Sequence, residues 1–210
     1  MKRSYSLITS ILICAFVYAG EVKTTYSKGT FHTNKTVTID ADFNRCSMVI
    51  DSFITDFQTN PPRLFEWAFK GLGQTHRNDG SDDIVLKINS TYYNPDSAKS
   101  VINADFVMSN GFTIRNKDLM SYVHDYNQAS TRRIEVEFYY SGMLLKRADG
   151  TFILTRLDTN HTQASISIDI RFGWFFNIFV TQRRHREVIE WRISRFVDNI
   201  KTEAEKKSND

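Results

Sequence analysis

The sequence predicts one α+β domain in which a curved antiparallel sheet of about seven strands wraps around a long C-terminal helix. Residues 162–172 alternate apolar and polar side chains, which is the period of a strand with one buried face. Residues 187–204 carry apolar side chains at helical spacing. Two further helical patterns lie between an early strand and the later strands, so that helices and strands are segregated along the chain.

The first residues have the composition of a cleaved secretion signal. Lys2 and Arg3 give a basic start, and Leu7–Val17 is an apolar run of about a dozen residues, shorter than the ~20 that a membrane-spanning helix needs. We therefore expect a secreted or periplasmic protein. The predicted boundaries are a signal peptide at 1–19, a single domain at 20–206 and a polar tail at 207–210.

Charge and cysteine content exclude several classes of protein. Removal of Lys2 and Arg3 with the signal leaves 25 of the 27 basic residues against 24 acidic ones, so the net charge falls to +1 and gives no support for nucleic-acid binding. Cys46 then has no partner for an intramolecular disulfide. A lipoprotein anchored through Cys14 is disfavoured because Ile13 replaces the small residue expected before such a cysteine.

The N-terminal half of the domain predicts a strand followed by two helices. Residues 31–39 alternate weakly and indicate a first strand at the sheet edge. Apolar side chains between Cys46 and Phe57 share one face of a helix. Asn60-Pro61-Pro62 ends that helix and starts a second one that reaches Gly71, because asparagine caps helices and proline suits their first position.

The rest of the domain predicts antiparallel strands joined by polar turns. Ile84, Leu86, Ile88, Ser90 and Tyr92 are expected on one face of their strand. Arg147–Gly150 is expected to be a hairpin turn, because Asp-Gly favours positive φ. Residues 111–128 fit a strand and irregular structure equally well. The remaining predicted strands cover 102–108, 134–140, 152–157 and 162–172.

This order of elements resembles the START-like, or SRPBCC, helix-grip superfamily. The resemblance covers about residues 28–206. Lys35–Phe43 is similar to the family's first strand and its entry into helix one, and Phe172–Phe179 followed by 187–204 is similar to the start of its last helix. The superfamily includes lipid-transfer START domains, coenzyme-Q-binding proteins and polyketide cyclase-like proteins. The resemblance implies a deep cavity between the sheet and the last helix.

Aromatic side chains are the main candidates for a ligand-binding wall. Residues 172–179 contain five aromatics, which either form core alone or also line a cavity. Phe175 and Phe179 share a face with the last helix's apolar stripe if that helix is continuous through this segment. The predicted ligand-binding residues are Trp67, Tyr92, Phe106, Phe138, Tyr140, Phe175, Phe179 and Arg186.

Arg186 has two interpretations. In a continuous helix it joins the inward stripe with Gln182, with His185 at its margin, and anchors the carboxylate or phosphate of a ligand. A helix break near Thr181 instead changes the phase of the stripe and leaves the basic run 183–186 in solvent. The second interpretation is favoured, because inward polar groups are unfavourable unless they are paired.

No catalytic residue, metal site or cofactor is predicted. His124 and Asp125 are neighbours on a strand and therefore point to opposite faces. The five histidines show no metal-binding spacing, and the chain has no glycine-rich phosphate loop or nucleophile elbow. Cys46 lies on the apolar stripe of its helix and is interpreted as packed core.

Three functional hypotheses follow. The first is an exported, monomeric, non-enzymatic protein that binds a hydrophobic small molecule, with transient membrane contact and no nucleic-acid partner. The second is a cyclase- or hydrolase-type enzyme that uses the same cavity. The third is a structural envelope-associated domain whose cavity is filled by inward side chains such as Phe106, Phe138 and Phe152.

Overall fold

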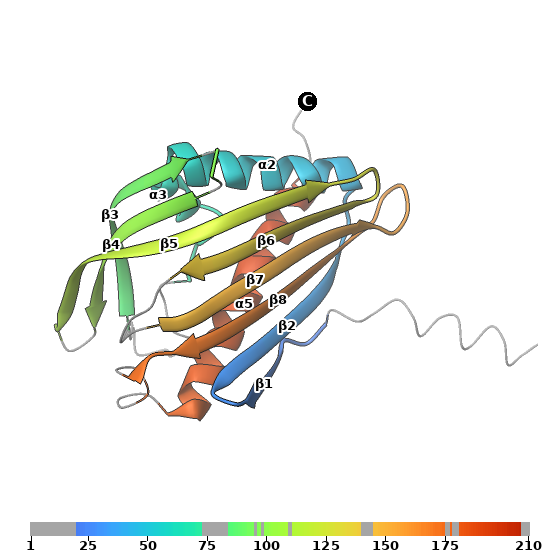
Figure 1. Ribbon diagram of the computed structural model, residues 1–210. Helices are drawn as coiled ribbons and strands as arrows, with labels where there is room; N and C mark the ends of the chain where they lie inside the picture. Colours follow the sequence, from blue (N-terminus) through green and yellow to red (C-terminus); the bar gives the residue numbers. More distant parts are fainter. Residues whose placement is uncertain are drawn as a thin grey trace, which may run out of the picture.

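A computed structural model describes residues 20–72, 84–94, 96–97, 99–108, 111–139, 145–174, 177 and 181–206. They form an α+β fold with an eight-stranded, fully antiparallel sheet in the order β1-β2-β8-β7-β6-β5-β4-β3 (Figure 1). The elements are β1 (Lys23–Ser27), β2 (Thr30–Ile39), α2 (Phe43–Thr59), α3 (Pro61–Leu64), β3 (Ile84–Asn94), β4 (Lys99–Met108), β5 (Thr113–Asn127), β6 (Thr131–Tyr139), β7 (Leu145–Arg156), β8 (Thr162–Phe172) and α5 (Gln182–Glu205).

The fold class is confirmed, and the strand count is higher than expected. The curved sheet carries α5 on one face, with α2 lying across one end (Figure 1). We call the face that carries α5 the inner face. The added strand is β1, which was missed because five residues give a weak pattern. The predicted first strand, β2, is consequently paired on both sides, and the ambiguous segment 111–128 forms β5.

The predicted hairpin turn at Arg147–Gly150 is wrong. These residues lie inside β7, where Asp149 pairs with Asp169 of β8 and Gly150 pairs with Ile168. Asp-Gly favours a turn locally, but pairing of β7 on both sides overrides this preference. Arg147 and Asp149 are two residues apart on the outer face and form an ion pair there.

A β-bulge in β3 corrects the predicted side-chain pattern. The register with β4 shifts between Ile88 and Ser90, so Asn89 is the extra residue. A bulge of one residue moves all later side chains to the opposite face. Tyr92 therefore lies on the outer face and is 60% exposed, although simple alternation placed it with Ile88.

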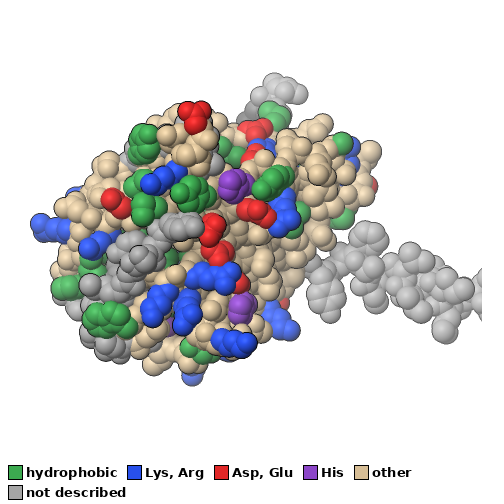
Figure 2. Space-filling view, viewed as in Figure 1, with side chains coloured by type: hydrophobic (Ala, Val, Ile, Leu, Met, Phe, Trp, Pro, Cys, Tyr) green, Lys and Arg blue, Asp and Glu red, His purple; other side chains and the backbone are tan. Residues whose placement is uncertain are grey.

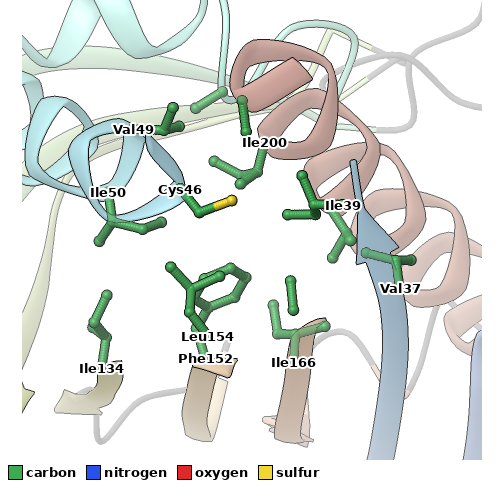
Figure 3. Packing of buried hydrophobic residues seen from close by; sticks show 14 of the residues in the cluster. Val37, Ile39, Cys46, Val49, Ile50, Ile134, Phe152, Leu154, Ile166 and Ile200 are labelled. Atoms are coloured by element: carbon green, nitrogen blue, oxygen red, sulfur yellow. The ribbon is translucent and has the colours of Figure 1, made fainter. Parts of the chain in front are cut away.

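The core is sealed at the end of the sheet that α2 covers. Figure 3 shows side chains of α2, α5 and β2 meeting those of β6, β7 and β8. Burial raises the pKa of the Cys46 thiol, which packs here as expected. We call this region the sealed half of the inner face; its members are at most 9% exposed, and they are Val37, Ile39, Cys46, Val49, Ile50, Ile134, Phe152, Leu154, Ala164, Ile166, Ile193, Val197 and Ile200.

Two buried cations fasten the helices to the sheet. Lys35 of β2 donates from Nζ to Asp198 Oδ1 (2.6 Å) and Ser194 Oγ (2.8 Å) of α5. Arg132 of β6 donates to Ser47 O of α2 (2.8 Å), and its guanidinium also binds Asp51 and Asp125. Buried charges of this kind are tolerated because they are paired and hydrogen-bonded. The position of each helix on the sheet is therefore fixed by directional contacts as well as by apolar packing.

Helix α5 begins at Gln182, with the Thr181 side chain accepting a hydrogen bond from Arg184 N at its N-terminus. This cap agrees with the interpretation in which the helix breaks near Thr181. Arg183 and Arg186 are exposed, as that interpretation requires. The interpretation is wrong for His185, which it placed in solvent, because the imidazole is buried.

Candidate ligand-binding site

The inner face of the sheet has a second region in which apolar side chains are only half-buried. It continues along β6 and β8 beyond the sealed half and extends onto β4 and β5, toward the end where β5 and β7 begin and β6 and β8 finish. We call this region the open half of the inner face. It consists of Ile102, Phe106, Leu119, Val136, Phe138, Ile168, Ile170 and Phe172.

Strand register places these side chains side by side. Ile102 of β4 pairs with Leu119 of β5. On the same face, Ser121 pairs with both Ser100 and Phe138, and it is buried. Side chains opposite each other on antiparallel strands interact directly, so the open half forms a continuous apolar surface with two small hydroxyls in it.

An aromatic cluster on the helices is half-buried as well. Phe53 of α2 contacts the rings of Trp67, Phe69 and Phe196, with centroids 5.7–6.2 Å apart. Trp67 donates from Nε1 to Asp56 Oδ2 (3.0 Å), so the polar end of its indole is satisfied inside the helical layer. These rings pack against the same core as four members of the open half, without being fully covered; the four are Val136, Ile168, Ile170 and Phe172.

His185 is a titratable side chain at the start of α5 that contacts the open half through Phe172. It is 6% exposed, and its ring stacks on Phe172 with centroids 4.0 Å apart and planes 15° apart. Phe31 contacts both rings at 5.7–5.9 Å. Sequence reasoning missed this position because it assigned the whole basic run to solvent. The signal was available, since His185 lies four residues before the buried Ile189.

The structure brings some predicted ligand-binding residues together and separates others. Phe106 and Phe138 are half-buried within the open half, and Trp67 belongs to the aromatic cluster. Tyr92 and Arg186 are exposed. Tyr140, Phe175 and Phe179 lie outside the described residues. The roles of these eight residues in binding stay predictions.

An open depression lies elsewhere, along α2 and α3. It is lined by Met48, Asp51, Ser52, Thr55, Asp56 and Arg63. Asp51 binds Arg132, and Asp56 binds Arg63 and Trp67. Since both carboxylates already have cationic or N–H partners, we assign no ligand to this depression.

Two other features are not found among the described residues. No helix among them is both long and apolar enough to cross a membrane. Within the same residues, no three His, Cys, Asp or Glu side chains are grouped so that they could hold a metal ion.

Solved structures with the same architecture cover most of the chain. A conserved protein from Geobacillus kaustophilus matches with a TM-score of 0.52 and 14% identity, over 82% of this chain and 94% of its own. The Zhui aromatase/cyclase from Streptomyces sp. R1128 matches with a TM-score of 0.51 and 12% identity, over 84% and 94%. The chain has the START-like helix-grip fold. The fold assignment from the sequence is therefore confirmed.

A START superfamily protein from Mycobacterium smegmatis is also similar, with a TM-score of 0.48 and 12% identity, over 83% of this chain and 97% of that one. No protein-family model matches the sequence, and no curated protein matches it. At these identities the likeness concerns the helix-grip fold and not the chemistry carried on it.

Proposed function

We propose that the protein binds a hydrophobic or amphipathic small molecule, such as a lipid, an isoprenoid or a polyketide-like compound, on the open half of the inner face. The observation that carries the proposal is the contrast in burial along single strands. Ile166 of β8 is 6% exposed, whereas Ile168 and Ile170 are half-buried on the same face. Apolar surface left partly uncovered inside a domain is typical of ligand sites.

A test by dye binding addresses this proposal. An environment-sensitive apolar dye is expected to bind the folded protein with about one site per chain. Phe138→Ala removes a phenyl group from the open half and is expected to weaken binding about tenfold or more, because burial of such a group contributes roughly 1.5–3 kcal/mol. Tyr126→Ala removes a ring of the outer face that is 51% exposed, and it should leave the affinity unchanged.

Native mass spectrometry of the purified protein, followed by organic extraction, identifies a co-purifying molecule and tests the expected monomer. A folded protein that shows no bound molecule and no thermal shift with dye or fatty acid has an inner face filled by its own side chains. The structural hypothesis then replaces the binding hypothesis.

A cyclase- or hydrolase-type enzyme is the second candidate, and His185 is the observation that favours it. A buried imidazole that stacks on Phe172 beside apolar surface is a group able to move protons. Turnover of a bound ligand that is lost in His185→Phe, while ligand affinity is retained, would favour the enzyme. Retained turnover would exclude His185 as its proton carrier.

Export and transient membrane contact complete the proposal. The basic start and apolar run of residues 2–17 support secretion, and N-terminal sequencing of exported protein is expected to start near Gly20.

Phe112 and Trp174 are 52% and 56% exposed beside strand ends at the open end of the sheet. Exposed aromatics of this kind suit a membrane interface. Sedimentation with neutral vesicles is expected to decrease in Trp174→Ala; unchanged sedimentation would remove this contact.

A further inference from the structure

We propose that Ser27, His32 and Asp169 form a catalytic relay on the outer face of the sheet that hydrolyses carboxylic esters. The site lies on the face opposite the open half, and it goes beyond the proposed binding function without depending on it. Three adjacent strands supply its members: β1, β2 and β8.

The register of these strands sets the three side chains in a row. His32 of β2 pairs with Asp169 of β8 on one side and with Thr25 of β1 on the other. Ser27 lies two residues after Thr25 and therefore on the same face. Diagonal and directly opposite neighbours on antiparallel strands are within reach of each other's side chains.

The distances match the connectivity of a nucleophile, a base and an orienting carboxylate. His32 Nδ1 lies 2.8 Å from Asp169 Oδ1, and His32 Nε2 lies 3.2 Å from Ser27 Oγ. The Asp169 carboxylate accepts a hydrogen bond from the Nδ1–H of His32, which leaves the Nε2 lone pair to accept the Ser27 hydroxyl proton. Asp169 thus selects the tautomer that a general base requires.

Exposure of the relay suits a reaction at the surface. The side chains of His32 and Asp169 are 37% and 28% exposed, and Ser27 is exposed at the end of β1. A substrate can reach Ser27 Oγ without any movement of the fold, while Asp169 is partly shielded from water. We expect slow turnover, since an exposed site holds its substrate less firmly than an enclosed one.

Basic side chains lie beside the relay. Lys28 and Gly29 form the tight turn after Ser27, with φ of 48° and 83°. Arg171 lies against this turn: a Cβ built on Gly29 would be 3.5 Å from Arg171 Nε. Arg147 approaches Asp169 at 3.7 Å from the other side. Figure 2 shows basic side chains gathered in the lower part of this view of the molecule.

The chemistry follows from these positions. Ser27 Oγ attacks the ester carbonyl while its proton passes to His32 Nε2, and the Arg171 guanidinium stabilises the negative charge that develops on the carbonyl oxygen. The C–O bond to the leaving alcohol breaks, and His32 returns the proton to that alcohol. Water then attacks the acyl-serine by the reverse proton path, releasing the carboxylic acid and restoring Ser27. The basic surroundings favour esters that carry a negative charge.

The experiment compares hydrolysis of 4-nitrophenyl acetate and its anionic analogue, 4-nitrophenyl hydrogen succinate, by the purified protein and by Ser27→Ala. Ser165→Ala is the matched control, because the Ser165 hydroxyl also lies on the outer face but bonds to Thr36 Oγ1 (3.1 Å) and not to a histidine. We expect hydrolysis to fall to the buffer rate in Ser27→Ala, to fall about tenfold or more in Asp169→Asn, and to stay unchanged in Ser165→Ala.

Two further measurements complete the test. A fluorophosphonate should label the protein once, with the mass added to the peptide that contains Ser27, and Arg171→Gln should slow the succinate ester more than the acetate. Circular dichroism checks that each variant is folded. Hydrolysis that persists in Ser27→Ala, labelling at another residue, or a wild-type rate equal to buffer would overturn the proposal.

Discussion

The two halves of the inner face share strands β6 and β8 and the same residue types, yet they differ in how completely they are covered. On β6, Ile134 is 8% exposed and Val136, two residues on, is half-buried. On β8, Ala164 and Ile166 are sealed, whereas Ile168 is not. On both strands the alternation of apolar and polar residues runs from the sealed half into the open half without a break. The hydrophobic pattern therefore decides which face of the sheet a side chain takes, and the helices that lie on that face decide whether the side chain becomes sealed core or stays partly uncovered.

The largest expected effect comes from disrupting the packing of α5 in the sealed half. Ile193 lies on the buried face of α5 and is 9% exposed, so Ile193→Asp places an unpaired charge between the helix and the sheet. The substitution should cost several kcal/mol of an unfolding free energy that is typically ~5–15 kcal/mol. Thr202→Asp introduces the same residue at an exposed position of α5 and should be almost silent. Thermal unfolding measures both. Equal melting temperatures would mean that α5 is not packed as described.

Truncating one apolar side chain in each half measures how fully that half is covered. Leu154→Ala empties a fully buried position and should lower the unfolding free energy by about 2–5 kcal/mol. Ile168→Ala removes a half-buried side chain of the open half and should cost about 1 kcal/mol, because less apolar surface is returned to water. Urea denaturation at constant m-value gives both numbers. A larger loss for Ile168→Ala would reverse the assignment of the two halves.

Ligand should stabilise the protein through the open half alone. At a dye concentration one hundred times its Kd, the folded state should gain about 2.7 kcal/mol. Phe138→Ala should lose roughly half of this gain, since a tenfold weaker Kd corresponds to about 1.4 kcal/mol. The measurement is the thermal shift with and without dye. A full shift in Phe138→Ala would place the dye elsewhere.

The smallest expected effect concerns the sheet edge next to α5. Glu190 Oε1 accepts a hydrogen bond from Thr24 N of β1 (3.1 Å), and therefore Glu190→Ala should cost about 0.5–1.5 kcal/mol. Glu187→Ala removes a carboxylate that pairs with the exposed Arg183 on the same helix and should cost less than about 0.5 kcal/mol. If the first variant is as stable as the second, the Thr24–Glu190 contact does not hold the edge strand.

Local periodicity was enough to predict most of the fold. The alternation in 162–172 and the helical spacing after 187 both correspond to observed elements, β8 and α5. Periodicity failed where one inserted residue reverses the side-chain alternation of a strand, and where strand pairing overrides a local preference for a turn. Asn89 reverses the face of Tyr92, and Gly150 extends inside a paired strand instead of turning. Neither event leaves a mark in the spacing of apolar residues.

The sites were less predictable than the fold because they combine distant segments. His32 and Asp169 are 137 positions apart and meet only because β8 returns to lie beside β2. Each residue alone is an ordinary polar side chain on a solvent-facing strand. The open half shows the same limit. The sequence predicted that Phe106 and Phe138 lie on the inner face, but how far other elements cover them depends on tertiary packing.

The bulge in β3 also affects how the protein behaves at high concentration. β3 is the last strand on one side of the sheet, so one row of its backbone N–H and C=O groups has no strand partner among the described residues and could pair with a strand from another molecule. The Asn89 side chain holds the bulge by donating to Asp105 Oδ1 (2.8 Å) and Asn103 Oδ1 (3.1 Å). At the bulge the backbone hydrogen-bonding groups of β3 are out of register with those of a regular incoming strand. The exposed Lys87 lies next to this point. The irregular edge thus opposes edge-to-edge aggregation of the sheet.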